Sequence, residues 1–327
     1  MVSKIRADEF SKAIDGDRQF SGAAVVVETD GPVLQMRSMG PPRPNDVVVQ
    51  VEALGLCRTD LRVFAGRIPV STPLVPGHEF AGVVANVGKD VKTASLGDRV
   101  VVNPVLACGR CEFCDQSPTL CQQTQFLGVD LDGACAEFMT VPASAVFRIP
   151  DSLAFNVAAF AEPVAASLAV LNASLQPQQR GVVLGSNRIA TLTRRILQAH
   201  GFENVVECSE QDVSVLTANS FDFAVETFAT SETIRHLIRS LRPRGTLVLK
   251  SRLRTPIELI IAELLPKQLR IECVNYGAFP QAIDLLSSGK VNVNDLIGPE
   301  FPLADFDRAF AHAVQDESVK TFIAPGA

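Results

Sequence analysis

Residues 181–190 read Gly-Val-Val-Leu-Gly-Ser-Asn-Arg-Ile-Ala, a short apolar run of strand character that ends in a glycine turn. They open an alternation of strand-like runs and helical segments that continues to about residue 274. Such an alternation favours a parallel sheet with helices on its faces, so we expect an α/β domain here. The expected strands are 181–184, 204–207, 221–226, 246–249 and 269–274, and the expected helices are 189–200, 231–241 and 256–265.

The chain on either side of this alternation has a different character. Residues 22–150 contain strand-like runs that are punctuated by glycine and proline, which indicates an irregular β-rich domain. Its expected strands are 23–28, 47–51, 80–87, 98–102 and 138–141. After residue 277 the pattern predicts helices at 280–287 and 303–314 and a last strand near 320–323.

Length, charge and hydropathy exclude several classes of protein. The 327 residues are enough for about two domains at roughly 150 residues each. The net charge is −6 and the longest basic block is the pair Arg194-Arg195, so nucleic acid is not an expected partner. The longest apolar stretches, 164–171 and 257–265, are shorter than the roughly 18 residues that cross a bilayer, so we expect no membrane span.

The first 21 residues and the cysteine content both favour a cytoplasmic protein. Residues 1–21 mix acidic and basic side chains and lack the apolar core of a secretory signal, so we expect a mobile or loosely docked extension. Eight cysteines in a chain of this length do not form a disulfide scaffold. Cys135 and Cys273 stand in apolar or strand-like surroundings, and we expect both to be buried structural residues.

Four of the cysteines are crowded into 14 residues with the spacing C-x2-C-x2-C-x6-C, namely Cys108, Cys111, Cys114 and Cys121. In a cytosolic protein such crowding indicates metal binding. Three thiolates from one tight loop and a fourth from the return of the chain suit the closed tetrahedral shell of a structural zinc ion. Because four sulfurs leave no open position, we do not expect catalysis at this zinc.

Seven segments of the chain together carry a resemblance to a known family. They are Gly55-Leu-Cys-Arg-Thr-Asp60, Pro76-Gly-His-Glu-Phe-Ala-Gly82, Gly97-Asp-Arg-Val100, the four-cysteine loop, Asp132-Gly-Ala-Cys-Ala-Glu-Phe138, Ala161-Glu-Pro163 and Leu241-Arg-Pro-Arg-Gly-Thr246. With them the chain resembles the medium-chain, zinc-dependent alcohol dehydrogenases, closest to the polyol and threonine dehydrogenase branches and to alcohol dehydrogenase-like relatives. The resemblance implies a β-rich GroES-like catalytic domain, 22–162 and 278–327, with a Rossmann dinucleotide-binding domain, 163–277, inserted in it.

The resemblance also implies a second, catalytic zinc ion, so that each chain would hold two. Cys57, His78 and Glu162 would be its three protein ligands, which leaves one position open for substrate or water. Glu79 follows His78 directly and would be a ligand that exchanges onto the metal. The carboxylate of Asp60 would hydrogen-bond the ligand histidine and fix its orientation.

The chemistry implied is the transfer of a hydride between a zinc-bound alcohol and a nicotinamide. Thr59 occupies the position whose hydroxyl takes the alcohol proton in the family, and Arg62 stands where liver-type enzymes end the proton relay on a histidine. Because arginine does not deprotonate, either water ends the relay or Arg62 meets an anionic or polyhydroxylated substrate, unless it is simply a solvated surface residue. Phe64 and Arg67 are further candidates for substrate contact.

The cofactor turn departs from the family. The expected G-x-G-x-x-G appears as Gly185-Ser-Asn-Arg-Ile-Ala190, so Asn187 replaces the glycine that lets the backbone approach a pyrophosphate, and Arg188 is new. Glu207 lies 22 residues after Gly185, where an acid contacts the ribose hydroxyls and repels a 2′-phosphate, so NAD(H) is favoured over NADP(H). Arg58 follows Cys57 directly and would contact the pyrophosphate.

The dinucleotide domain is also short. Only residues 208–220 separate the second expected strand from the next, which is room for one connection but not for an additional strand and helix. In the order 3-2-1-4-5-6 the missing third strand is an edge, so the sheet survives its loss. We expect a zinc- and NAD(H)-dependent oxidoreductase that acts on a small alcohol or polyol and forms a homodimer or homotetramer. The alternative is a zinc-binding pseudoenzyme or regulatory protein of the same fold.

Overall fold

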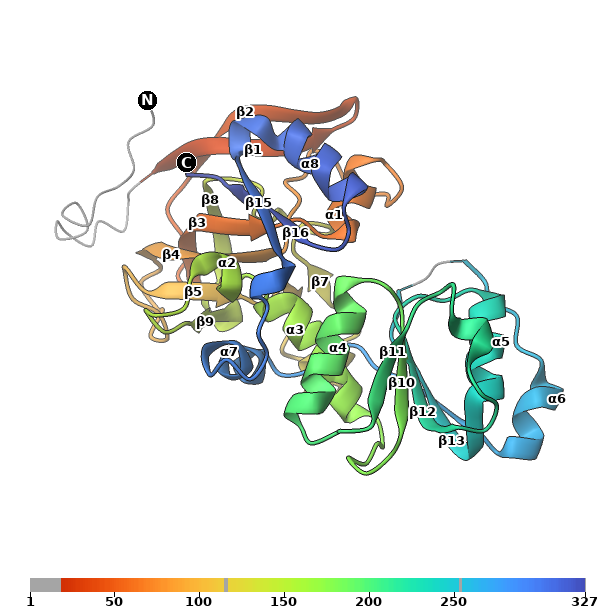
Figure 1. Cartoon of the computed structure of the whole chain (residues 1–327). Helices are drawn as coiled ribbons and strands as arrows, with labels where there is room; N and C mark the ends of the chain where they lie inside the picture. Colours follow the sequence, from red (N-terminus) through yellow and green to blue (C-terminus); the bar gives the residue numbers. More distant parts are fainter. Residues whose placement is uncertain (1–18, 115–116, 253–254, 327) are drawn as a thin grey trace. The chain divides into compact units, whose positions relative to one another are not determined.

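The computed structural model describes residues 19–114, 117–252 and 255–326. The chain forms two compact units, with a division after Glu162 and another before Val293. Unit 1 contains the described residues up to Glu162 and from Val293 onward, and unit 2 is Pro163–Asn292. Figure 1 shows both units in the colours of the sequence.

Unit 1 is built on a mainly antiparallel sheet that packs against an apolar core. Its described part has the strand order β15-β16-β3-β4-β5-β9, with β8 paired to β3, and only β15 and β16 run parallel. Two smaller pairs are β1-β2 and β6-β7. The strands are β1 (Phe20–Glu28), β2 (Gly31–Met39), β3 (Asp46–Gly55), β4 (Glu79–Val87), β5 (Arg99–Val102), β6 (Val105–Leu106), β7 (Gln125–Phe126), β8 (Phe138–Pro142), β9 (Val146–Arg148), β15 (Ile297–Pro302) and β16 (Lys320–Ala324).

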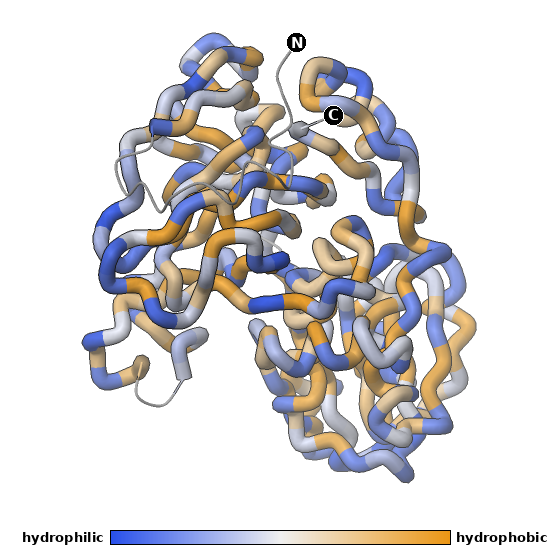
Figure 2. Tube along the Cα trace, turned by 90° about the vertical axis from the view of Figure 1, so that its left-hand side faces the viewer, coloured by the Kyte–Doolittle hydropathy of each residue, from blue (hydrophilic) through white to orange (hydrophobic). Residues whose placement is uncertain are grey.

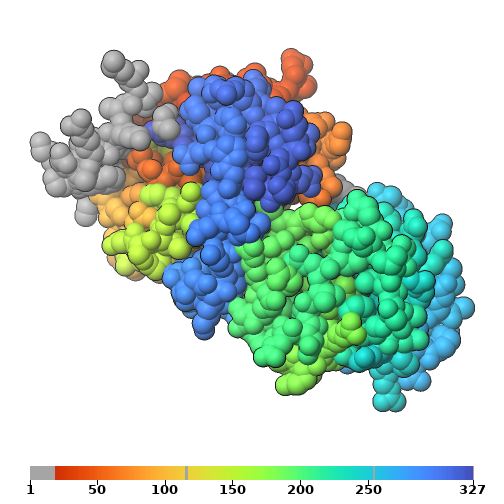
Figure 3. Space-filling view, in the orientation of Figure 1, coloured from red at the N-terminus to blue at the C-terminus, as the bar shows by residue number. Residues whose placement is uncertain are grey.

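Both parts of the chain that make up unit 1 contribute to this core. The C-terminal strand β16 pairs with β3, and helix α8 (Phe306–Gln315) contacts α1 (Arg58–Phe64). The space-filling view shows the C-terminal residues, in blue, against N-terminal strands in red and orange (Figure 3). Apolar side chains of β1, β3, β4, β5 and β8 are buried together. Figure 2 shows hydrophobic stretches, in orange, alternating with hydrophilic ones, in blue, along the chain.

Unit 2 is a parallel sheet with helices on its faces, as the alternation in the sequence predicts. Its described strands follow the order β11-β10-β12-β13-β14, and every neighbouring pair is parallel. They are β10 (Gly181–Leu184), β11 (Val205–Cys208), β12 (Phe221–Glu226), β13 (Leu241–Leu249) and β14 (Arg270–Cys273). Helices α4 (Arg188–Ala199) and α5 (Ser231–Ser240) lie on opposite sides of this sheet (Figure 1).

The shortened dinucleotide-type sheet is confirmed. β11 ends at Cys208 and the chain returns to β12 at Phe221 through one short 3-10 turn, Val213–Val215. β11 is therefore an edge of the described sheet, at the side where a third strand would follow. The α/β fold class, with a GroES-like β-rich unit and a shortened Rossmann-like unit, is thus what the structure shows.

Several expected boundaries differ from the structure. The helix expected at 256–265 is reduced to α6 (Ile261–Leu264), because Pro256 and Pro266 restrict the backbone on either side. Strands β2, β6, β7, β9 and β15 have no counterpart in the expectations. Residues 1–18 of the expected extension lie outside the described residues, while β1 already begins at Phe20.

Residues 278–292 cluster with unit 2, whereas the sequence analysis placed them in the catalytic domain. They include α7 (Phe279–Ser287), and two contacts connect them to α4 and its C-terminal end. Gln281 Nε2 lies 3.1 Å from His200 Nε2, and the guanidinium of Arg195 donates to the carbonyl of Asn292. α7 therefore packs with the α/β unit before the chain returns to unit 1.

Two further expectations concern buried apolar residues. Cys135 is buried as expected, but Cys273 is exposed because it lies on β14, the strand at the other edge of the sheet. Phe155–Asn172 is long and apolar enough to cross a membrane by composition, a longer run than the sequence analysis recognised, and 67% of it is buried. It comprises α2 (Phe155–Ala158), α3 (Ala161–Leu168) and a 3-10 turn, as in the core of a globular fold.

Candidate functional site

A cluster of potential metal ligands lies where β3 ends and β4 begins. Cys57 is the residue before α1, and His78 and Glu79 stand at the start of β4. The pairing of Gly55 with Glu79 in the β3–β4 register brings these two chain segments together. Ligand atoms of Cys57, His78 and Glu79 all lie within 4.8 Å of one another, and His78 and Glu79 are buried.

Asp60 holds this cluster in place. Its carboxylate accepts hydrogen bonds from the backbone N–H of Cys57, at 2.8 Å, and of Gly77, at 3.1 Å. His78 Nδ1 lies 3.0 Å from Asp60 Oδ1, so Nε2 is the ring nitrogen left for a metal. Gly77 has φ +102°, a conformation that favours glycine and turns His78 toward this carboxylate. Asp60 is only 1% exposed, and the structure places it where the resemblance implied.

The electrostatics of the cluster favour a thiolate. Burial by itself raises the pKa of Cys57, but the neighbouring ring of His78 outweighs burial, and the pKa of the thiol is lowered. Burial also opposes the charged form of His78, yet Asp60 and Cys57 raise its pKa well above the ordinary value. Without a metal the pair is therefore a thiolate beside a protonated ring, and a zinc ion would take the place of the ring proton to give one thiolate and one imidazole ligand.

Lys320 is a residue of this site that the sequence analysis did not find. It is 2% exposed at the start of β16, and its ammonium forms an ion pair with the carboxylate of Glu79. Its Nζ also lies 5.4 Å from the centre of the Phe160 ring. Burial lowers the pKa of Lys320 to about 8, against the opposing influence of Cys57 and Asp60. A lysine that opens a strand at position 320 carries no local sequence signal for such a role.

The remaining residues of the expected catalytic set surround the cluster less closely. Glu162 is buried in the first turn of α3, but its carboxylate is not among the atoms that lie within 4.8 Å of one another. Thr59 is half-buried in α1. Arg62 and Arg67 are exposed. Phe64 packs on Phe310 of α8, with ring centres 3.7 Å apart, which gives it a place in the packing of unit 1.

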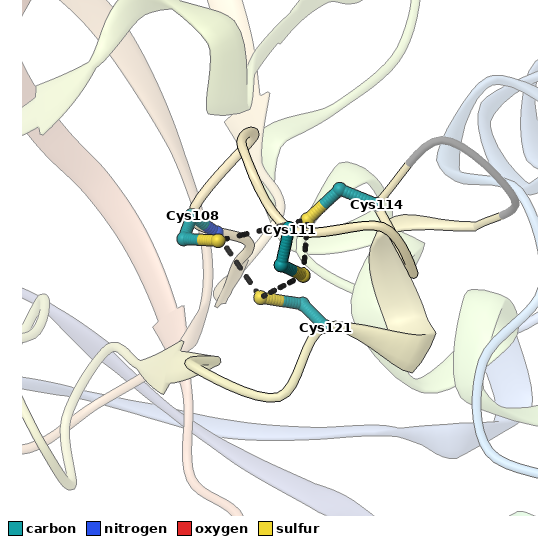
Figure 4. Close-up of side chains that lie close together, drawn as sticks. All are labelled: Cys108, Cys111, Cys114 and Cys121. Atoms are coloured by element: carbon teal, nitrogen blue, oxygen red, sulfur yellow. Dashed lines mark hydrogen bonds between the residues drawn. The ribbon is translucent and has the colours of Figure 1, made fainter.

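The four-cysteine loop forms a second cluster in unit 1. The sulfurs of Cys108, Cys111, Cys114 and Cys121 point toward one another (Figure 4) and lie within 4.8 Å of one another. Their closest separations are 3.4 Å for Cys111 and Cys114, 3.8 Å for Cys108 and Cys114, and 4.0 Å for Cys111 and Cys121. Zinc–sulfur bonds of about 2.3 Å place the corners of a tetrahedron about 3.8 Å apart, so the loop fits a zinc ion.

Backbone N–H groups stabilise the thiolate form of two cysteines in this loop. Those of Cys108 and Gln123 donate to Cys121 Sγ at 3.2 and 3.3 Å and lower the pKa of this thiol. The N–H of Gln122 makes the largest contribution to lowering the pKa of Cys111 to about 6. Burial and the neighbouring thiols raise the pKa of Cys114 to about 11. The four thiols therefore do not all lose their protons together unless a bound cation balances the negative charge.

In unit 2 the glycine turn is closed by its own side chains. Gly185 has φ +137°, which favours glycine, whereas Asn187 is extended at φ −116° and precedes α4. The side chain of Asn187 accepts from the N–H groups of the second and third helical residues, and a carboxylate from residue 210 accepts from Ser186. The sequence alone does not predict these contacts. Arg188 is the first residue of α4.

The two charged residues expected at the cofactor have partners within their own units. Glu207 on β11 accepts from Arg194 Nε on α4 at 2.8 Å. Arg58 lies 3.6 Å from the carboxylate of Glu317, and its side chain is 38% exposed. Both are surface ion pairs, which contribute little stability and which a ligand can replace at low cost.

Comparisons with known proteins agree with this arrangement. Residues 43–151 match the alcohol dehydrogenase GroES-like domain. The chain is 27% identical to the probable D-xylulose reductase A of Aspergillus clavatus, over 90% of this chain and 92% of that protein. A zinc-binding dehydrogenase from Sinorhizobium meliloti 1021, solved with NADP, superimposes with a TM-score of 0.85 at 26% identity, over 94% of this chain and 100% of the other. An alcohol dehydrogenase from Escherichia coli CFT073, solved with NADH, has a TM-score of 0.86 at 23% identity, over 93% of this chain and 99% of the other.

Two units of this kind, with a buried cysteine–histidine centre on the β-rich one, define a medium-chain dehydrogenase or reductase. Within that class, the matched GroES-like domain and the D-xylulose reductase relative support a zinc-type, polyol dehydrogenase-like alcohol dehydrogenase. The resemblance inferred from the sequence motifs is therefore confirmed.

Proposed function

We propose that this protein is an oxidoreductase that interconverts a small alcohol or polyol and its carbonyl compound with a nicotinamide dinucleotide. The observation that carries the proposal is the buried cluster of Cys57, His78 and Glu79, which Asp60 orients through three contacts. The similarity to a D-xylulose reductase favours sugar alcohols and keto sugars among the possible substrates.

The residues of the cluster fit a zinc ion. Cys57 offers a thiolate, His78 offers Nε2, and either Glu79 or Glu162 offers a carboxylate as a third ligand. When bound, zinc would stabilise the alkoxide form of a coordinated alcohol and polarise a carbonyl. Lys320 holds the carboxylate of Glu79 by an ion pair, so we propose that Glu162 is the more permanent ligand and Glu79 the exchanging one.

The chain's own side chains supply the other parts of the mechanism. Asp60 fixes the imidazole of His78 so that one nitrogen faces the substrate region. Thr59 lies two residues after Cys57, and we propose that its hydroxyl carries the proton of the alcohol. Arg62 is exposed, which favours water as the end of the proton relay.

We propose that the four-cysteine loop holds a second, structural zinc ion and that unit 2 binds the nicotinamide dinucleotide. The spacing of the sulfurs supports the first part. The parallel sheet, Gly185 and the acid at the end of β11 support the second. Glu207 would disfavour the 2′-phosphate of NADP(H), and Arg58 and Arg188 would meet the phosphates.

We also propose that two copies of the chain associate through the β14 edge of unit 2. β14 has one neighbour in the described sheet, and Ile271 on it is 40% exposed. Ile261 and Leu265, just before β14, are 58% and 69% exposed. An unpaired strand edge beside apolar side chains is a surface that a second copy can cover. Light scattering should give two or more chains per particle, and Leu265→Glu should shift the particle toward a single chain.

The proposed function is tested by metal analysis and a substrate panel on the same preparation. Elemental analysis should find two zinc ions per chain, and Cys57→Ser should retain one. Sugar alcohols, amino alcohols and aldehydes, each offered with NAD(H) and NADP(H), should include a substrate that the unmodified protein turns over and Cys57→Ser does not. No binding of either dinucleotide by a protein with both zinc ions would contradict the proposal and favour the regulatory alternative.

A further inference from the structure

The turn that opens α4 carries a set of internal hydrogen bonds. The first N–H groups of a helix lack partners within the helix and, with the helix dipole, form an anion site. In α4 these donors are the N–H groups of Ile189 and Ala190, and the side-chain oxygen of Asn187 accepts from both, at 3.0 and 3.1 Å. An amide of the chain itself therefore takes up donors that a pyrophosphate uses in dinucleotide-binding proteins.

Asn187 is also held from its other side. Its Nδ2 donates to Thr227 Oγ1 at 3.0 Å, and this hydroxyl donates to the carbonyl of Leu184 at 2.8 Å. The amide is thus fixed between the end of β12 and the start of α4. Position 187 has an ordinary extended backbone, so the asparagine is present without strain.

Glu210 closes the turn from the loop after β11. Its two carboxylate oxygens accept from the N–H of Ser186, at 3.0 Å, and from the hydroxyl of Ser186, at 2.6 Å. A carboxylate is itself a mimic of a phosphate oxygen pair at such donors. It also places a negative charge where a second anion would have to approach.

We infer that Asn187 and Glu210 occupy the phosphate position of unit 2, so that these two side chains set the affinity for the dinucleotide and must move when it binds. This inference rests on the proposed nicotinamide cofactor. Gly185 lets the turn pack closely against Thr227, because an added Cβ would lie 2.2 Å from Thr227 Oγ1. The fold thus retains the strand-to-helix turn, but the N–H groups of this turn donate to Asn187 and Glu210.

The test is the dissociation constant of NADH, measured by the change in nicotinamide fluorescence without substrate. Asn187→Gly frees two N–H donors at a cap position that glycine tolerates, and it should bind NADH about 10-fold more tightly. Asn187→Asp keeps the two hydrogen bonds accepted from the helix N–H groups, loses the one donated to Thr227 and adds a charge, so it should bind more weakly than the unmodified protein. Glu210→Gln should bind about 10-fold more tightly, because it removes the charge that opposes the phosphates.

Glu203→Gln is the matched control, because Glu203 is exposed in the same unit and its change alters net charge equally. It should leave the dissociation constant unchanged. If the unmodified protein binds NADH and neither Asn187→Gly nor Glu210→Gln binds it more tightly, the inference is wrong and the proposed function stands. If no variant binds NADH at millimolar concentration while zinc is present, the proposed function fails and the inference fails with it.

Discussion

The cysteine–histidine cluster of unit 1 and the glycine turn of unit 2 differ in what their polar atoms face. Around Cys57 and His78, the hydrogen bonds of Asp60 come from behind and leave the sulfur and one ring nitrogen available for a ligand. In the turn, Asn187 and Glu210 accept from the very groups that would meet a ligand. A cluster with ligand atoms available and a turn whose donors are satisfied by its own chain can therefore stand in one fold, and their backbones alone do not distinguish them.

The largest expected effect is a loss of zinc and of stability when the four-cysteine loop is changed. Cys121→Ser removes one of four sulfurs, and the incomplete shell should lose its zinc and about 4 kcal/mol of unfolding free energy. Elemental analysis and chemical unfolding measure both quantities. Cys135→Ser is the control, because Cys135 is a buried cysteine outside either cluster, and it should keep two zinc ions per chain. Equal stability of Cys121→Ser and the unmodified protein would contradict a metal in this loop.

The second effect concerns turnover at the first cluster. Thr59→Val removes a hydroxyl while keeping the shape of the side chain, and it should lower kcat by about 10²- to 10⁴-fold. Zinc content and the NADH dissociation constant should not change. Thr59→Ser, which restores a hydroxyl, should recover most of the turnover. Full turnover by Thr59→Val would remove Thr59 from the proton path and leave the metal cluster unaffected.

A smaller effect tests whether Asp60 orients the cluster of Cys57, His78 and Glu79. Asp60→Asn weakens the hold on His78 and on two backbone N–H groups, and it should lower zinc affinity at this cluster by about 10- to 100-fold. A competition titration with a coloured chelator measures this affinity, and the four-cysteine loop of the same molecule serves as the internal reference. Asp132→Asn is a matched control, because Asp132 also accepts from a backbone N–H, that of Val75, in unit 1. An unchanged zinc affinity of Asp60→Asn would show that Asp60 does not orient the ligands of this cluster.

The sequence predicts contacts between residues that are close in the chain better than contacts between residues that are far apart in it. The spacing of Cys108, Cys111, Cys114 and Cys121 carries its own chemistry, because a single loop supplies every ligand. Cys57 and His78 come from separate segments, and the resemblance of their motifs to a known family identifies them. The ion pair of Glu79 with Lys320 joins residues 241 positions apart, and no local pattern announces it.

The glycine turn of unit 2 is also only partly predictable from the sequence. The replacement of a glycine by Asn187 is visible in the sequence, and it indicates a changed cofactor turn. That Glu210 and Thr227 complete the closure depends on which strands are neighbours, since β11 and β12 both lie beside β10. The exposure of Cys273 likewise follows from the place of β14 at a sheet edge, which strand composition alone does not give.

The smallest expected effect concerns the choice between the two nicotinamide cofactors. Glu207 should favour NADH by repelling the 2′-phosphate of NADPH, but its ion pair with Arg194 at 2.8 Å offsets part of that repulsion. Because an exposed pair is worth up to about 1 kcal/mol, Glu207→Ala should narrow the NADH preference by about 5-fold, with Arg194 then free to meet the phosphate. Arg194→Gln should widen the preference, since it leaves the carboxylate without its counter-charge. The ratio of the two dissociation constants, measured by nicotinamide fluorescence for each variant, checks both directions. A preference for NADPH in the unmodified protein would mean that Arg194, or Arg188 at the start of α4, already receives the extra phosphate and that Glu207 does not face the ribose.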